Sequence, residues 1–231
     1  MTPKRSKRVT AAELMAELQK DPGYQAFLEE SERRTQFNRE NYRREAAPVL
    51  ADLREADFDV ESVGELVHRQ REYRAAVPVL LRWLPKISDR RVREDIIRTL
   101  SVPWARPDAV RPLIAEFRKL RHPDENGIGW VIGNALEVIA DDAIFEDVVA
   151  IATDKRYGSS REMVVAALGN MKNPKAKEVL IVLDDDDVAG YAIMGLGKLK
   201  AKEAKAKIEP FLNHSQQWVR QEARKALRKM G

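Results

Sequence analysis

The sequence predicts an all-α fold, a right-handed α-solenoid (superhelix) built from about five helix pairs. A leucine recurs near the end of each apolar helical segment, and four positions before it stands another apolar residue, which is the spacing of one helix face. The recurring leucines are Leu100, Leu136, Leu168, Leu196 and Leu227, separated by 36, 32, 28 and 31 residues. Turn-forming stretches such as 122–127 (HPDENG) and 156–160 (RYGSS) separate neighbouring helices.

A second apolar helix precedes each of these and completes the pair. The five segments are 75–84 (AAVPVLLRWL), 108–117 (DAVRPLIAEF), 144–152 (IFEDVVAIA), 175–183 (KAKEVLIVL) and 204–212 (AKAKIEPFL). Interior glycines are unfavourable in helices by roughly 1 kcal/mol. Gly169 and Gly197 each follow a recurring leucine, on the side that meets the next unit. We therefore expect them to allow close approach of helix backbones, with Gly190 in the first turn of its helix.

These units carry a resemblance to a known family. The segments 92–100 (VREDIIRTL), 160–180 (SREMVVAALGNMKNPKAKEVL), 188–212 (VAGYAIMGLGKLKAKEAKAKIEPFL) and 219–227 (VRQEARKAL) resemble HEAT-like repeats of the phycobilisome-lyase type. The resemblance covers residues 72–231. It implies a scaffold that binds other macromolecules, and it does not imply the lyase activity found in a minority of the family.

The first 71 residues differ in character and form a predicted N-terminal extension. Residues 1–9 are basic and expected to be disordered. A short helix is predicted over 11–21, and DPGY at 21–24 marks a break. A long, highly charged helix follows over 24–56, and another short one over 58–69 with Asp59 or Ser62 as its cap. The sequence therefore predicts two regions, 1–71 and 72–231.

The amino-acid composition excludes some classes of function and makes others less favoured. The chain has 231 residues, 41 basic and 37 acidic, for a net charge of +4, and it is 44% hydrophobic and 34% charged. That excess of positive charge is too small to predict nucleic-acid binding by itself. The absence of cysteine excludes disulfides, thiolate zinc sites and a cysteine nucleophile. The basic start lacks the apolar stretch of a signal peptide, and no apolar run could span a membrane, so we expect a cytoplasmic protein.

Signatures of catalysis and metal binding are scarce. His68, His122 and His214 share no ligand spacing, and no nucleophile, phosphate-loop or zinc-protease motif is present. The run Asp184–Asp187 lacks the ligand alternation and central glycine of an EF-hand. We expect those aspartates to cap a helix N-terminus instead. No catalytic residue, metal or cofactor is predicted.

The predicted partner site is the concave face of the second helices. Positions pointing away from the core in the middle repeats are largely apolar, whereas the outer repeats place charges there. An exposed apolar patch of this kind indicates an interface, here with a protein partner. The alternative is that these side chains are buried, or covered by residues 1–71. The predicted site comprises Val131, Asn134, Val138, Met163, Tyr191, Met194 and Lys198.

The basic C-terminal face supports a second reading. Its possible contacts to phosphate or an acidic partner are Arg220, Arg224, Lys225, Arg228 and Lys229. Because the last repeat has no successor, these side chains also fit a polar cap. Some alkylpurine DNA glycosylases are built from HEAT-like repeats with aromatic residues and a carboxylate in a basic groove. Trp130 and Tyr191 resemble those aromatics, but Asn134 stands one turn after Trp130, and no acidic residue is clearly placed beside them.

Overall fold

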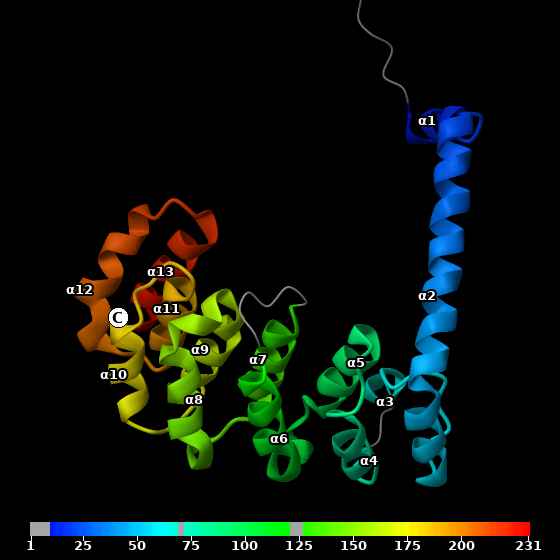
Figure 1. Ribbon diagram of the computed structural model, residues 1–231. Helices are drawn as coiled ribbons and strands as arrows, with labels where there is room; N and C mark the ends of the chain where they lie inside the picture. Colours follow the sequence, from blue (N-terminus) through cyan, green and yellow to red (C-terminus); the bar gives the residue numbers. More distant parts are fainter. Residues whose placement is uncertain (1–9, 69–71, 121–126) are drawn as a thin grey trace, which may run out of the picture. The chain divides into compact units, whose positions relative to one another are not determined.

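The computed structural model describes residues 10–68, 72–120 and 127–231, and within those ranges every regular element is a helix (Figure 1). This confirms the predicted all-α class. The basic start at 1–9 and most of the turn at 122–127 lie outside the described residues. The chain divides into two compact units, residues 1–45 and residues 46–231, and the division falls inside one long helix. The boundary expected from the sequence, between residues 71 and 72, lies further along the chain than this division.

Residues 10–45 form two helices that begin at strong local signals. α1 (Ala11–Leu18) starts with a capping box, in which the Thr10 hydroxyl accepts from the Glu13 amide and the Glu13 carboxylate accepts from the Thr10 amide. α2 (Pro22–Glu55) starts after Asp21, whose carboxylate accepts hydrogen bonds from the amides of Gly23 and Tyr24. Proline in the first turn lacks an amide that would be unpaired anyway. The predicted break at DPGY is therefore a real helix start.

Residues 46–231 contain the end of α2, the short α3 (Glu65–His68) and two sets of helices that alternate along the chain. The first-helix row is α4 (Ala76–Trp83), α6 (Arg106–Arg118), α8 (Phe145–Thr153), α10 (Lys175–Val182) and α12 (Lys205–Ile208). The second-helix row is α5 (Arg90–Leu100), α7 (Ile128–Ile139), α9 (Glu162–Leu168), α11 (Ala189–Lys198) and α13 (Gln217–Lys229). Short 3-10 turns connect them: η1 (Pro103–Ala105), η2 (Asp142–Ile144), η3 (Lys155–Arg161), η4 (Lys202–Ala204) and η5 (Glu209–Asn213).

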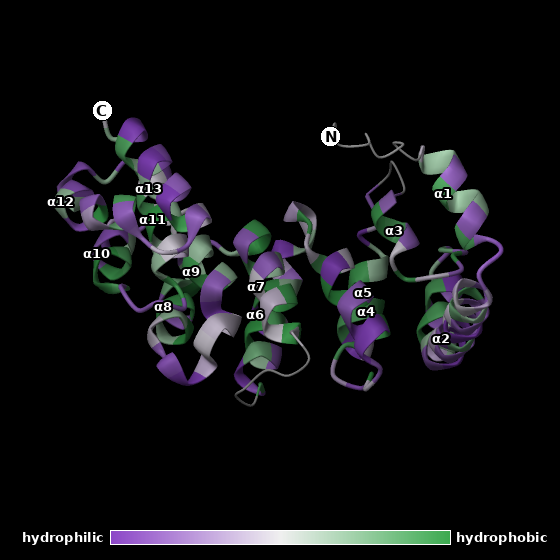
Figure 2. Ribbon diagram, turned by 90° about the horizontal axis from the view of Figure 1, so that it is seen from above, coloured by the Kyte–Doolittle hydropathy of each residue, from purple (hydrophilic) through white to green (hydrophobic). Residues whose placement is uncertain are grey.

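Each member of the second-helix row packs against the next, from α5 through to α13, and α4, α6 and α8 also contact one another in order. The recurring leucines supply the core between the rows, since Leu100, Leu136, Leu168 and Leu196 are all buried. The last one, Leu227, is partly exposed. Hydrophobic and hydrophilic residues alternate around these helices in Figure 2, as expected where one side is buried.

The glycines of the second-helix row explain how closely its helices pack. A Cβ added at Gly169 would lie 2.5 Å from the Cα of Gly195, and one at Gly197 would lie 2.9 Å from the Cα of Ala226. No side chain fits in either contact, so the predicted backbone approach is confirmed. Gly190 lies in the first turn of α11 as expected, and a Cβ there would be 2.1 Å from the ring of Trp218.

The aspartate run has a different role from the one predicted. Val188 is the N-cap of α11, and no side chain accepts a hydrogen bond there, so the expected capping of α11 by Asp184–Asp187 is wrong. Asp185 instead pairs with the guanidinium of Arg161, which is 1% exposed and also donates to the carbonyls of Gly158 and Ala152. A buried cation requires such partners, and this need outweighs the cap.

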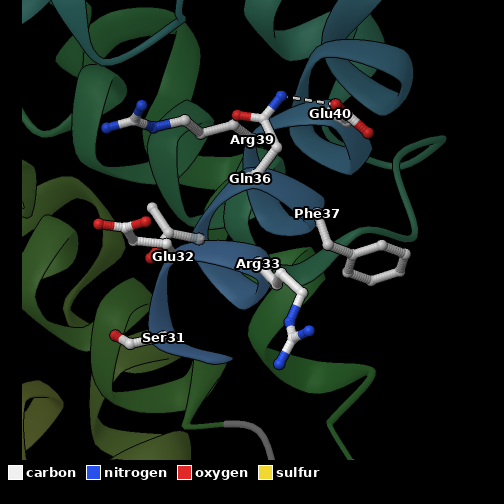
Figure 3. A pocket seen from close by; sticks show the side chains of 8 residues that line it. Ser31, Glu32, Arg33, Gln36, Phe37, Arg39 and Glu40 are labelled. Carbon is white, nitrogen blue, oxygen red and sulfur yellow. Dashed lines mark hydrogen bonds between the residues drawn. The ribbon is translucent and has the colours of Figure 1, made fainter. Parts of the chain in front are cut away.

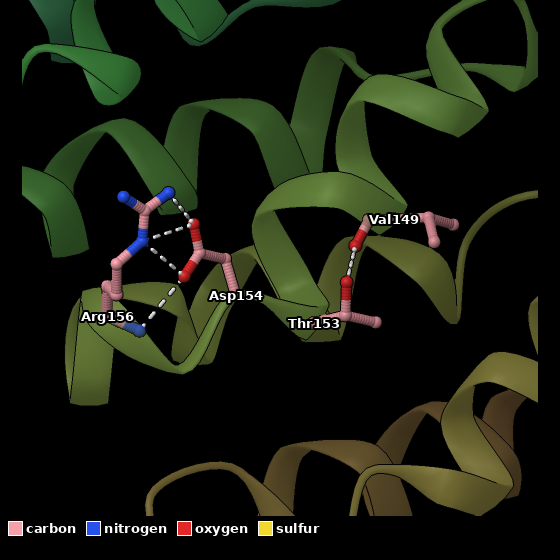
Figure 4. Close-up of polar contacts among 4 residues, drawn as sticks. All are labelled: Val149, Thr153, Asp154 and Arg156. Atoms are coloured by element: carbon pink, nitrogen blue, oxygen red, sulfur yellow. Dashed lines mark hydrogen bonds and ion pairs between the residues drawn. The ribbon is translucent and has the colours of Figure 1, made fainter.

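Capping by aspartate does occur earlier in the chain, at the end of α8. Thr153 donates to the Val149 carbonyl at 2.8 Å, and the Asp154 carboxylate accepts from the Arg156 amide at 3.0 Å (Figure 4). The Arg156 guanidinium also pairs with Asp154, at 2.7 Å. These contacts end α8 and begin η3, which leads directly to the buried Arg161.

Candidate interaction face

The residues predicted to bind a partner all lie on the second-helix row, but they are not equally accessible. Val138 is 39% exposed and Lys198 is exposed, whereas Asn134, Met163, Tyr191 and Met194 are half-buried. Val131 is only 4% exposed, so it contributes mainly to packing. It lines a cleft together with residues of α3 and α5. We call the accessible part of this row the interaction face.

A polar bridge crosses the interaction face. Lys198 of α11 donates to the Glu137 carboxylate of α7 at 2.7 Å and to the side-chain oxygen of Asn170 at 3.0 Å, and Asn170 donates to Glu137 at 2.9 Å. Burial raises the pKa of Glu137, but the hydrogen bonds from Lys198 and Asn170 outweigh it, so the pKa lies below its ordinary value. The centre of the face is therefore less apolar than its sequence pattern indicates.

The bridge joins the last turns of α7 and α11. The first turns of four successive second helices carry Trp130, Glu162, Tyr191 and Trp218, which we call the aromatic–carboxylate cluster. The Tyr191 hydroxyl donates to the Glu162 carboxylate and accepts from the Trp130 indole. On its other side, the Tyr191 ring lies 5.1 Å from that of Trp218. The two tryptophans are 42% and 40% exposed, so each presents part of its ring to solvent.

The Glu162 carboxylate is electrostatically unusual. Burial raises its pKa, the hydrogen bond from Tyr191 opposes that rise, and the nearby Asp187 adds to it. Burial together with the charge of Glu162 raises the pKa of Tyr191 to about 12, so its hydroxyl stays protonated and keeps donating. Within the described part of the chain, neither Glu162 nor Asp187 forms an ion pair. The cluster thus combines aromatic rings with acidic charge that no cation neutralises.

A cleft of about 400 Å³ adjoins the interaction face at its N-terminal side, where α3, α5 and α7 meet. Two of the predicted residues, Val131 and Asn134, line it, with Val67 exposed at its edge. Its remaining lining is mixed in polarity and consists of Gly64, His68, Asp95, Arg98, Ser101 and Ala135. His68 lies beside Asp95 and Arg98 here, but the three form no group that could hold a metal.

The basic residues of α13 divide into two kinds. Arg220 donates to the carbonyls of His214 and Ser215, and Lys225 pairs with Glu222 at 2.7 Å, so both have partners in their own segment. Arg224, Arg228 and Lys229 are exposed, and none of the three forms an ion pair with another described residue. These three are therefore the accessible part of the predicted basic face.

The other features of the described residues form no binding site. A hollow beside α2 is lined by Ser31, Glu32, Arg33, Thr35, Gln36, Phe37, Arg39 and Glu40 (Figure 3). Consecutive residues of one helix point outward in all directions, so they do not enclose a ligand. Across the described ranges, no three metal-ligating side chains come together. Every helix in those ranges is too short or too polar to cross a bilayer.

Sequence reasoning missed Glu162 and Trp218. Glu162 stands six positions before Leu168, as Trp130 stands six before Leu136, so the two occupy corresponding positions in α9 and α7. That shared position was the available signal, because α7 and α9 pack against each other. Within the helix of Trp130 itself, the residue one turn later is Asn134, which is not a carboxylate. The structure supplies the carboxylate from the next helix.

Comparison with known proteins gives no relative: no family model matches the chain, and no curated protein or solved structure matches it significantly.

Proposed function

We propose that residues 72–231 form a right-handed solenoid of five HEAT-like helix pairs, which acts as a non-enzymatic scaffold and binds a protein partner on the concave face of its second helices. The successive packing of α5, α7, α9, α11 and α13 supports the repeat arrangement. The glycine contacts between neighbouring second helices support it as well, because they recur at corresponding positions. Such stacked repeats present a long continuous surface suited to binding a macromolecule.

The observation that carries the binding proposal is the location of exposed apolar side chains. Among the described residues after 45, the large exposed hydrophobic ones are Val67, Trp130, Val138, Val182 and Trp218. All but Val182 lie on the second-helix row or at the edge of its cleft. Exposed apolar and aromatic groups gathered on one face are typical of protein interfaces, where tryptophan is especially enriched.

The test compares two matched surface variants. Trp130→Ser combined with Val138→Ser removes apolar groups from the interaction face, and Val182→Ser removes one from the first-helix row. Affinity capture from a lysate with each variant, quantified by mass spectrometry, should show at least about a tenfold loss of a defined protein with the double variant only. Unchanged melting temperatures establish that both variants fold. Loss of the partner with Val182→Ser alone would place the interface on the other row and contradict the proposal.

A second candidate is nucleic-acid binding through the basic C-terminal face, including an activity similar to that of alkylpurine DNA glycosylases. Exposed Arg224 and Arg228 favour nucleic-acid contacts. The position of Glu162 beside Trp130 and Tyr191 supplies the carboxylate that the chain lacks next to those aromatics in sequence. However, Glu162 and Asp187 bring uncompensated acidic charge that repels phosphates, so we favour the protein partner.

Two measurements separate these candidates. Binding of a fluorescent DNA duplex should weaken steeply with salt and fall in Arg224→Ser with Arg228→Ser if the basic face contacts phosphates. Release of a modified base from alkylated DNA by the pure protein, lost in Glu162→Gln, would establish the glycosylase. If neither binding nor release is detected, the scaffold proposal stands alone.

A further inference from the structure

We propose that the aromatic–carboxylate cluster of Trp130, Glu162, Tyr191 and Trp218 binds an arginine side chain from a basic segment of the protein partner. This inference rests on the scaffold function proposed above and specifies the chemistry of the partner. It depends on how the four side chains lie, on the burial of Glu162 and on the charges around it.

The geometry offers a guanidinium two kinds of contact at once. Its flat face can stack on an indole ring, and its edge can donate to a carboxylate. Both tryptophans present exposed ring surface, and Tyr191 joins them through its hydrogen bond with Trp130 and its ring contact with Trp218. The same Tyr191 hydroxyl fixes the Glu162 carboxylate beside the rings. One carboxylate oxygen can hold that hydrogen bond while the other accepts from a ligand.

The negative charges around the cluster favour a cation as its ligand. Glu162 is about half-buried, and Asp187 acts on it as a second negative charge. The nearest aspartates of the same run are already engaged, because Asp185 pairs with Arg161 and Asp184 pairs with Lys207. Among the described residues no cation pairs with Glu162 or Asp187. A bound cation would remove this imbalance, whereas an anion would add to it.

The site is built and held in place before any ligand arrives. Trp218 lies directly over Gly190, where even a methyl group would not fit, and its indole donates to Gln216 at 2.6 Å. Glu162 and Tyr191 belong to the first turns of α9 and α11, which pack against each other. Preorganised groups lose little conformational entropy on binding, which favours a specific ligand over a general attraction between opposite charges.

Arginine fits better than lysine. The guanidinium is planar and weakly hydrated, and it both stacks on aromatic rings and donates in parallel to a carboxylate. The lysine ammonium is compact and strongly hydrated, so it would gain less from the exposed indole faces. The partner segment should therefore show a requirement for arginine that positive charge alone does not meet.

The test uses a blocked synthetic peptide, GSRGRSG, and a matched peptide in which citrulline replaces both arginines. Citrulline keeps the shape and most donors of arginine but is neutral. Titrations with the full-length protein, followed by tryptophan fluorescence and by calorimetry, should give at least about tenfold tighter binding of the arginine peptide. Glu162→Gln keeps an acceptor for Tyr191 while removing the charge, and it should weaken that binding by about tenfold or more. The matched control, Glu178→Gln on α10, should bind like the unmodified protein.

The outcomes separate this inference from the scaffold proposal. Equal binding of the two peptides, or no change in Glu162→Gln, would overturn the arginine site. If the variants at Trp130 and Val138 still lose their captured protein in that case, the scaffold function stands without it. Preferential binding of a single-stranded oligonucleotide over the arginine peptide would also overturn the inference, because it would show that the face takes anions.

Discussion

Residues 10–45 and residues 46–231 are both helical, yet they are stabilised in opposite ways. No residue between 10 and 45 is buried, and the aromatic side chains of Phe27 and Phe37 are 65% and 67% exposed. In residues 46–231 four of the five recurring leucines and many alanines are buried in a core. Helical pattern alone therefore does not determine whether a segment contributes to a core.

The difference follows from what each region offers to its neighbours. α1 and the first part of α2 rely on caps at Thr10 and Asp21 and on polar contacts one turn apart, such as that between Gln36 and Glu40. Such local contacts contribute only a few tenths of a kcal/mol each, up to about 1 kcal/mol for a cap. The helices of residues 46–231 instead bury large apolar side chains, each worth about 1.5–3 kcal/mol. Substitutions should accordingly have much larger effects in the second region.

The largest contrast should come from deleting a core side chain. Leu168→Ala removes a fully buried leucine of α9, and we expect a loss of about 2–5 kcal/mol in the free energy of unfolding. Leu14→Ala removes a leucine that is 51% exposed on α1, and we expect a change of less than about 0.5 kcal/mol. Urea denaturation followed by circular dichroism measures both. Equal losses in the two variants would contradict the contrast between the regions.

The next largest loss of stability should come from removing a buried charged side chain. Arg161→Ala leaves the carbonyls of Gly158 and Ala152 and the Asp185 carboxylate without their cation, so we expect a loss of about 3 kcal/mol. Asp185 remains partly exposed, which keeps the loss below that of a fully buried pair. Arg44→Ala removes the partner of Glu45 from the surface of α2, and should change stability by about 0.5 kcal/mol or less. Melting temperatures well below that of the unmodified protein are expected for Arg161→Ala alone.

How much the sequence could predict follows the same division between local and distant contacts. The core leucines and the close contacts at Gly169 and Gly197 were predictable, because the same pattern recurs at the same place in successive second helices. The pairing of Asp185 with Arg161 was not, since a local cap competes with a contact 24 residues away. The spacing of residues along the sequence does not show whether the local cap or the distant ion pair forms.

The candidate site was predicted less completely than the core. Periodicity predicts an exposed Val131, but its side chain is buried where α7 lines a cleft with α3 and α5. It also predicted an apolar centre, whereas Lys198 reaches across α9 to Glu137 and makes that centre polar. Long side chains cross between helices at angles that depend on the packing distance. That distance depends on the close contacts at glycines of the same helices. The sequence pattern does not give its value, so the cross-helix contact could not be predicted.

A smaller effect tests whether that packing distance matters. Gly169→Ala places a methyl group 2.5 Å from the Cα of Gly195, so α9 and α11 must move apart. We expect a loss of about 1–3 kcal/mol, typical of overpacking. Gly64→Ala is the matched control, because its new methyl group would meet Asp95 at an ordinary 3.6 Å. A stable Gly169→Ala protein would mean that the second-helix row tolerates wider spacing than its backbone contacts indicate.

The smallest effect comes from the polar bridge and depends on pH. The pKa of Glu137 is lowered from its ordinary value of 4.5 in the folded protein, so its ionised form is favoured by folding. The bridge therefore stabilises the protein fully above pH 4.5, and this contribution is lost as the pH falls through the lower folded pKa. Because both side chains are partly exposed, we expect about 0.5 kcal/mol at pH 7.

A double-mutant cycle with Glu137→Gln and Lys198→Met isolates that interaction from the other consequences of each change. The coupling energy, measured by urea denaturation, should be present at pH 7 and should decline as the solution is made more acidic than pH 4.5. Asn170 accepts from Lys198 and donates to Glu137, so the coupling energy includes this path through Asn170 as well as the direct ion pair. A coupling energy that stays constant down to pH 3 would contradict this expectation, because the interaction would then not depend on protonation of Glu137 in that range. Acidification to pH 3 would in that case leave the link between α7 and α11 across the interaction face intact.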